Sequence, residues 1–201
     1  MLVVTRLALV AILSVWTLSA WAQQPPLRLR GTIEALDGNV LSVKTNDGAA
    51  HKITLTDNVT VVAVVKATQA DIKEGSYLGS AAMPQSDGSQ KALEVHIFPD
   101  SMRGTGEGHR PYAPVQGGTM TNGTVNATGA AADGHGMTVR HRDGETKIVV
   151  PAGVPIVRYV IGDKSDLKAG AAFTVLSATK KPDGTLEAAR VNVGRDGAVP
   201  Q

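Results

Sequence analysis

The sequence contains no cysteine, so no disulfide framework holds the chain together and its fold must rest on packed cores. Aromatic residues are also scarce. Both tryptophans lie near the N-terminus, and the remaining chain has only Phe98, Phe173, Tyr77, Tyr112 and Tyr159. Sites for sugars and single-stranded nucleic acids usually contain aromatic stacking platforms, and this chain has little material for them.

The charges of the chain nearly cancel, with 20 basic and 18 acidic residues, so no net field draws it to nucleic acid or to an anionic membrane. The sequence has no G-x-S-x-G elbow and no cysteine nucleophile. Most carboxylates stand in Asp-Gly turns or helix caps, where backbone geometry accounts for them. We therefore expect no enzymatic activity.

The N-terminal segment carries the longest apolar run. Arg6 precedes the apolar stretch from Leu7 to Leu18, and the small residues Ala20 and Ala22 follow. This order is typical of a secretory signal peptide, predicted at 1–22 with cleavage after Ala22. The run is short for a membrane span, so we expect no stable membrane insertion after cleavage. An exported chain without cysteine favours the bacterial periplasm.

After this segment the sequence repeats itself. The stretch RGTIEALDGNVLSVKTNDG, which starts at Arg30, corresponds to NGTVNATGAAADGHGMTVRHRDG, which starts at Asn122. A repeat of this length indicates two copies of one small domain. We expect the copies at 28–99 and 122–194, a Gly/Pro-rich linker at 100–121 and a flexible tail at 195–201.

Each copy alternates apolar and polar residues with a period of two, which predicts strands. Asp-Gly pairs between these runs predict tight hairpins. Thr68 and Asp163 are N-cap candidates for one or two helical turns that Gly75 and Gly170 can close. The prediction is an all-β fold with short helices, made of two tandem OB-like five-stranded β-barrels. A five- or six-stranded sandwich with a helical plug has the same element order and remains open.

The GT-[IV] opening, the A-D-[IL]-K-x-G turn and the final DG-x-x-x-A-x-x-V strand recur in both copies. In these motifs the chain resembles a bacterial family of exported domains of unknown function. The resemblance implies an OB-like fold and export, and it supplies no catalytic residues. Relatives of this layout are sometimes labelled as metal-transporter permeases, but a permease needs several spanning helices, which this sequence does not offer.

The linker gathers an unusual polar set, namely Glu107, His109, Arg110 and Tyr112. One hypothesis is a loop that lies across a barrel and presents these side chains to a ligand. The other is a solvated connector, which its glycines and prolines also fit. Its glycines do not form a phosphate loop, because the Lys-Ser/Thr ending is missing.

Histidines suggest a divalent metal as a second hypothesis. His109 lies in the linker, His135 in the loop Asp-Gly-His-Gly-Met, and His141 on the following strand. Imidazole and carboxylate groups are common ligands of transition metals. No HxH, HxxxH or HExxH spacing occurs, however, and His51 and His96 are interpreted as sheet-end or solvent-facing residues.

A third candidate is the outward face of the second copy. With Met137 and Val139 directed inward, Arg140 and Arg142 point outward, and Lys147 and Arg190 are expected on the same surface. Such a face could hold a polyanion or an acidic envelope protein. The sequence thus predicts an exported, non-catalytic binding or structural module without a cofactor. The alternative is a periplasmic metal-binding or metal-transport accessory protein.

Overall fold

The computed structural model describes residues 27–132 and 134–200 of the 201-residue chain. The predicted signal peptide at 1–22 and its cleavage site lie outside these residues. Within the described ranges, no helix has the length and apolar character needed to cross a membrane.

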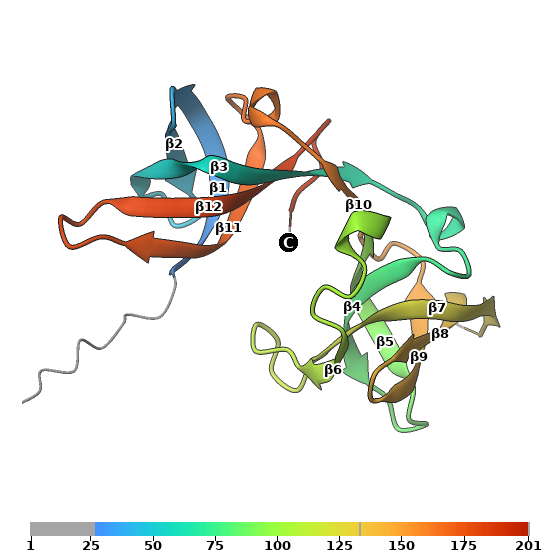
Figure 1. Cartoon of the computed structure of the whole chain (residues 1–201). Helices are drawn as coiled ribbons and strands as arrows, with labels where there is room; N and C mark the ends of the chain where they lie inside the picture. The colour runs from blue at the N-terminus through green and yellow to red at the C-terminus, as the bar shows by residue number, and fades with distance from the viewer. Residues whose placement is uncertain (1–26, 133, 201) are drawn as a thin grey trace, which may run out of the picture.

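The structure is all-β with three short 3₁₀ helices, as the alternating sequence predicts (Figure 1). The first part of the chain contains β1 (Leu27–Asp37), β2 (Val40–Thr45), β3 (Ala50–Lys66), η1 (Gln69–Asp71), β4 (Tyr77–Pro84), β5 (Gln90–Phe98), η2 (Asp100–Met102) and β6 (Gly108–Pro111). The second part contains β7 (Thr119–Ala131), β8 (Gly134–His141), β9 (Gly144–Pro151), β10 (Ile156–Ile161), η3 (Lys164–Asp166), β11 (Ala172–Lys180) and β12 (Leu186–Gly194).

A closed five-stranded barrel forms the first lobe. Its strands follow the cyclic order β1, β2, β3, β12, β11, in which β3 and β12 are parallel and all other neighbours are antiparallel. The strands β11 and β12 belong to the second sequence copy. The first copy therefore does not close this barrel with its own strands.

The second lobe shows the reciprocal exchange. Strands β7, β8 and β9 of the second copy pair with β4 and β5 of the first copy. The parallel contacts here are made by β5, with β9 and then with β10. The structure does not confirm two tandem barrels. The boundaries 28–99 and 122–194 delimit repeats in the sequence, whereas each lobe in Figure 1 is built from both repeats.

The two lobes exchange their strands where β3 and β10 cross. These strands pair antiparallel from Val62 opposite Ile161 to Lys66 opposite Val157. Val64 and Tyr159, which stand at equivalent positions of the two copies, face each other in this ladder. A local two-fold axis therefore passes through the crossing. Beyond it, β3 leads from the first lobe into the second, and β10 leads from the second lobe into the first.

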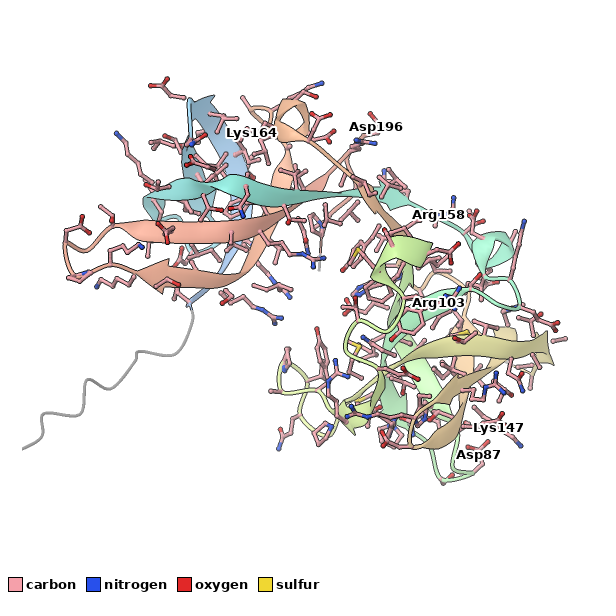
Figure 2. The ribbon with its side chains drawn as sticks, viewed as in Figure 1. Asp87, Arg103, Lys147, Arg158, Lys164 and Asp196 are labelled. Carbon is pink, nitrogen blue, oxygen red and sulfur yellow. The ribbon has the colours of Figure 1, made fainter. Side chains whose placement is uncertain are left out.

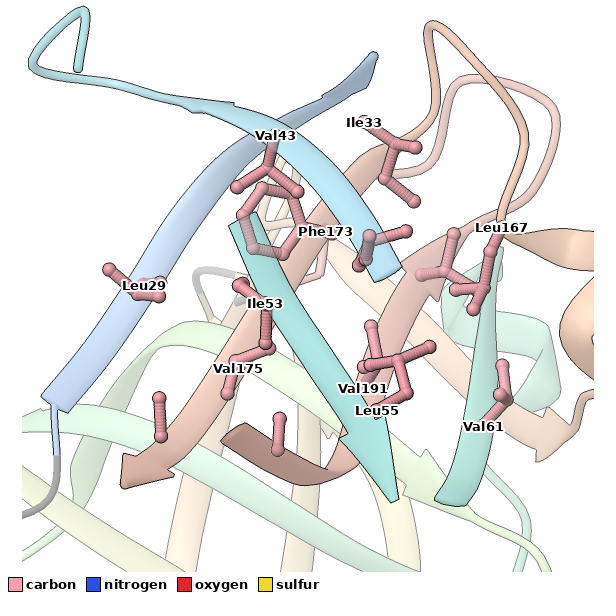
Figure 3. Close-up of a cluster of buried hydrophobic side chains, with 14 of the residues drawn as sticks. Leu29, Ile33, Val43, Ile53, Leu55, Val61, Leu167, Phe173, Val175 and Val191 are labelled. Carbon is pink, nitrogen blue, oxygen red and sulfur yellow. The ribbon is translucent and has the colours of Figure 1, made fainter. Parts of the chain in front are cut away.

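The hydrophobic core of the first lobe is built from side chains of both copies. Sixteen buried side chains form this core, and half come from the second copy, including Leu167, Phe173 and Val191. Phe173 is only 1% exposed and packs among Val43 and Ile53 of the first copy (Figure 3). Neither copy can bury its apolar face alone in this arrangement.

The hairpin turns and the N-caps follow the sequence prediction, whereas the helical turns end at Ile72 and Leu167 and not at Gly75 and Gly170. The glycines of the predicted Asp-Gly pairs all have positive φ, from 56° at Gly38 to 132° at Gly144. The turns η1 and η3 are single 3₁₀ turns, and in both a carboxylate accepts a hydrogen bond from the backbone N–H of the capping residue: Asp71 from Thr68 at 2.8 Å and Asp166 from Asp163 at 3.0 Å. Local chemistry therefore determines these elements in both copies.

The segment 100–121 and the tail are more ordered than predicted. Residues 108–111 form β6, which pairs antiparallel with β7, and the carbonyl of Thr105 accepts hydrogen bonds from Tyr77 and Asn122, both at 3.0 Å. At the C-terminal end, residues 195–200 return to the crossing, where Ala198 is 2% exposed. Both segments pack onto the exchanged strands, which differs from the solvated connector of one hypothesis and from the flexible tail expected at 195–201.

Candidate functional site

Aromatic side chains gather where the lobes meet. Phe98 packs edge-on against Tyr159 with 5.1 Å between ring centroids, and Tyr77 packs against Phe98 at 5.7 Å. They extend a small core that includes Val62, Val64, Val157 and Ala198. In the described part of the chain only Phe173 lies away from this junction, so the few aromatic residues are concentrated at the exchange point.

A buried polar group lies beside these rings; we call Arg30, Glu94, His96, Tyr112 and Tyr159 the junction cluster. The Tyr112 hydroxyl donates to Glu94 Oε1 at 3.3 Å, and His96 Nε2 lies 3.5 Å from the same oxygen. His96 Nδ1 lies 3.4 Å from the Tyr159 hydroxyl. Glu94 and His96 come from β5, Tyr112 follows β6, Tyr159 comes from β10, and Arg30 comes from β1 in the other lobe.

The electrostatics of the cluster keep Glu94 charged. Burial raises the pKa of Glu94, but the nearby His96, the hydrogen bond from Tyr112 and the charge of Arg30 outweigh it, so the pKa lies below its ordinary value. Burial, with the charge of Glu94, raises the pKa of Tyr159 to about 12. A carboxylate that is 12% exposed thus has protein groups as its main stabilising partners.

Arg30 takes part in the cluster and also reaches the surface. Its charge acts on Glu94, and a hydrogen bond to Tyr112 opposes the rise in the pKa of that tyrosine, while its Nε is buried without a hydrogen-bond partner among the described residues. Buried polar atoms are nearly always satisfied, so this arginine is an unusual position in the described part of the chain.

A hollow of about 670 Å³ opens at Arg30. Its lining includes Arg28, Arg30, Thr45, Asp47, His51 and Pro114. Asp47 accepts hydrogen bonds from Thr45 and from the Ala49 backbone, which lower its pKa, so this carboxylate is already engaged. The two arginines leave the hollow with an excess of positive charge. Its volume lies in the usual range for ligand pockets.

The structure separates the predicted linker residues. Tyr112 belongs to the junction cluster, whereas His109 lies on the second lobe, where its Nδ1 is 2.8 Å from Thr121 Oγ1. Arg110 donates to the carbonyl of Gly106 at 2.7 Å. Glu107 is half-buried, and its charge adds to the effect of burial in raising the pKa of Tyr77. These four residues therefore do not form one site.

Two of the three predicted metal ligands come together. The rings of His109 and His141 stack with 6.1 Å between centroids, and burial followed by the charge of His141 lowers the pKa of His109. His141 is occupied, because its Nε2 lies 2.9 Å from Thr146 Oγ1 and its Nδ1 accepts from the Asp143 N–H at 3.3 Å.

His135 lies at the other end of β8, opposite Val150. Across residues 27–132 and 134–200, no group of three His, Asp or Glu side chains is arranged to hold a metal ion. The divalent-metal hypothesis remains a prediction.

The predicted basic face is partly neutralised and smaller than expected. Met137 and Val139 are buried as predicted, and Arg140 and Arg142 are exposed. Arg140 stands opposite Glu145 in the β8–β9 ladder, and Arg142 Nε lies 3.6 Å from Asp143 Oδ2.

Two further basic residues complete the comparison with the prediction. Lys147 lies near Asp87 at the end of the second lobe far from the first (Figure 2). The prediction that Arg190 shares this surface is wrong, because β12 belongs to the first lobe and Arg190 lies there beside Asn192.

Sequence reasoning missed Arg30, Glu94 and His96 as a group. His96 is 7% exposed and lies at the junction, so its interpretation as a sheet-end or solvent-facing residue is wrong. The three residues lie in one copy, but the exchange places Arg30 in one lobe and Glu94 in the other. The sequence did indicate that Glu94 and His96 are neighbours, because residues two apart on a strand lie on the same face.

Searches of protein-family models, of curated proteins and of solved structures found no match to this chain. The resemblance to an exported OB-like family therefore remains a prediction.

Proposed function

We propose that the protein is an exported, non-catalytic binding module of the bacterial periplasm that holds an anionic partner at the junction of its lobes. The observation that carries the proposal is the position of Arg30, which joins the polar cluster of both lobes to a positively charged hollow of about 670 Å³. We further propose that both lobes are OB-like barrels, because their strands follow the same cyclic order and parallel pairing occurs at the equivalent place in each: β12 with β3 in one lobe, and β5 with β9 and β10 in the other.

The junction supports this function better than the face around Arg140 and Arg142. Carboxylates stand beside both of those arginines at the surface, whereas Glu94, the carboxylate coupled to Arg30, is 12% exposed, and Asp47, which lines the hollow, is already bonded within its own turn. A partly enclosed cation also binds an anion more strongly than a solvated one, because less water screens it.

The experiment compares two double variants of the chain from Gln23 to Gln201. One replaces Arg28 and Arg30 with glutamine, and the other replaces Arg140 and Arg142. Melting temperature is followed with a heparin-derived oligosaccharide, lipopolysaccharide, a short oligonucleotide and an acidic peptide, since a ligand of the native state raises it by mass action.

We expect at least one of these anions to stabilise the wild type. The shift should disappear in the Arg28/Arg30 variant and persist in the Arg140/Arg142 variant. Loss of the shift only in the latter would move the site to the second lobe. Absence of any shift for all four anions would overturn the proposal and leave a structural role.

A further inference from the structure

The two-fold relation between the lobes reveals a position that is filled in one lobe and open in the other. Arg30-Gly31-Thr32 on β1 corresponds to Asn122-Gly123-Thr124 on β7 in the repeat. In the second lobe, β7 pairs with β4 along one edge. Along its other edge it pairs first with β6, over residues 119–122, and then with β8 from Thr124 onward.

In the first lobe no strand of the described residues occupies the position equivalent to β6. β1 pairs with β11 along one edge and with β2 from Gly31 onward along the other. No strand in the described ranges pairs with Leu27–Arg30 on the β2 side. The hollow of about 670 Å³ lies at this stretch, which we call the β1 edge groove.

Two residues of the groove stand at the positions on which β6 packs in the second lobe. Thr45 and Asp47, which line the groove, correspond in the repeat to His141 and Asp143. In the second lobe His109 of β6 stacks on His141, and Gly108 packs so closely on Asp143 that an added Cβ would lie 2.9 Å from Asp143 Oδ2. The first lobe thus keeps the aspartate of this seat and replaces its histidine with a smaller threonine.

The backbone of β1 is oriented for pairing in the groove. Ile33 donates to the Ala171 carbonyl on the β11 side, and the Arg30 carbonyl accepts from Asn46 on the β2 side. Successive residues of a strand direct their backbone groups to opposite edges, so those of Arg28 face the open edge. An edge with free N–H and C=O groups is a template for an added strand.

We propose that the β1 edge groove binds an extended acidic segment of a partner protein, which adds as a strand antiparallel to Leu27–Arg30. Two acidic residues separated by one position would stand opposite Arg28 and Arg30, since directly paired side chains lie about 5 Å apart across strands. The residue between them would face Leu29 and Thr45, as His109 faces Thr121 in the second lobe, so a β-branched residue suits it.

This inference rests on the proposed function and names its partner. A peptide is favoured over other anions because β6, the segment seated at the equivalent place, makes its contact through a strand ladder. Charge alone would serve a sulfated sugar equally well, and the test must separate these two cases.

The test uses a fluorescent peptide with a Thr-Glu-Val-Glu-Thr core and two N-methylated versions of it. Alternate residues of a strand direct their backbone N–H groups to opposite edges. One version is therefore N-methylated at every second residue, which blocks one edge of the added strand, and the other version is N-methylated at the residues between, which blocks the opposite edge. Both versions keep the same charge. Anisotropy measures binding to the wild type, to Arg28→Glu and to Lys147→Glu, a matched charge reversal on the second lobe. Both substituted residues are exposed, so folding should be retained, and a melting curve of each variant confirms it.

We expect the unmodified peptide and one N-methylated version to bind, and the other version to bind at least about tenfold more weakly. Arg28→Glu should weaken binding by a similar factor, and Lys147→Glu should not. Hydrogen exchange should show new protection at the Arg28 amide with the peptide bound.

Equal binding of both N-methylated versions, with displacement by sucrose octasulfate, would overturn strand addition but leave the proposed anion site standing. Binding of sucrose octasulfate without any peptide binding would do the same. If neither probe binds, the inference and the proposed function both fail.

Discussion

The exchanged strands predict that a cut between the two copies leaves the protein intact. The tip of the segment between β6 and β7 is exposed at Ala113, Pro114 and Gln116, so a protease site placed there can be cleaved in the folded protein. Seven of the thirteen strand pairings join the part before this cut to the part after it.

The expected strength of this association follows from the cores. In the first lobe six large apolar side chains come from the second part: Leu167, Phe173, Val175, Leu186, Val191 and Val193. In the second lobe four come from the first part: Ile72, Leu78, Val95 and Ile97. At about 2 kcal/mol each, these ten side chains contribute roughly 20 kcal/mol. That exceeds the about 4 to 15 kcal/mol that two associating chains lose in translational and rotational freedom.

The assay is size-exclusion chromatography with light scattering on the cleaved protein at micromolar concentration. We expect one peak with the mass of the whole chain, and two separate fragments only after addition of denaturant. Uncleaved protein is the control. Separation of the fragments in native buffer would refute the exchange and would restore two tandem barrels.

Two further predictions concern titrating groups. Asp166 binds Arg195 through both carboxylate oxygens, at 2.6 and 2.8 Å, and caps η3, so Asp166→Asn should lower the free energy of unfolding in urea by about 1 kcal/mol. Hydrogen bonding from Arg195 lowers the pKa of Asp166, so this stability is present above its unfolded value of about 4 and is lost as pH falls below it. The variant should therefore lose less stability than the wild type on acidification, and equal losses would count against the pair. Burial raises the pKa of Tyr77 and Tyr112 above 10 and that of Tyr159 to about 12, so ultraviolet titration should show a last ionisation near pH 12, and Tyr159→Phe should remove that last step. Stability from this burial is lost as pH rises above about 10, and a step that survives the substitution would contradict the assignment.

Local features were predictable because they depend on neighbouring residues. Asp37-Gly38 forms a tight turn for reasons contained in its own backbone, and the caps at Thr68 and Asp163 need only a carboxylate three positions later. The inward direction of Met137 and Val139 follows from the alternation of a strand.

The exchange was not predictable in this way. Both copies carry the same inward pattern, so Phe173 could equally pack against its own copy or against the other. The choice depends on whether β3 continues straight beyond Val61 or bends back, which short-range patterns do not encode. Arg30 and Glu94 approach each other only because of this exchange, so their proximity could not be predicted from the sequence.

The pairing of β1 with β11 also determines when the protein can fold. Leu29 pairs with Val175, so the first barrel cannot close until most of the chain has been made. Contacts between such distant residues slow folding, because a long loop must be closed before they form. Until then β1, β2 and β3 expose unpaired edges and half of a core, a state prone to aggregation. Such a chain is therefore most prone to aggregate in the interval between the synthesis of β3 and the synthesis of β11 and β12.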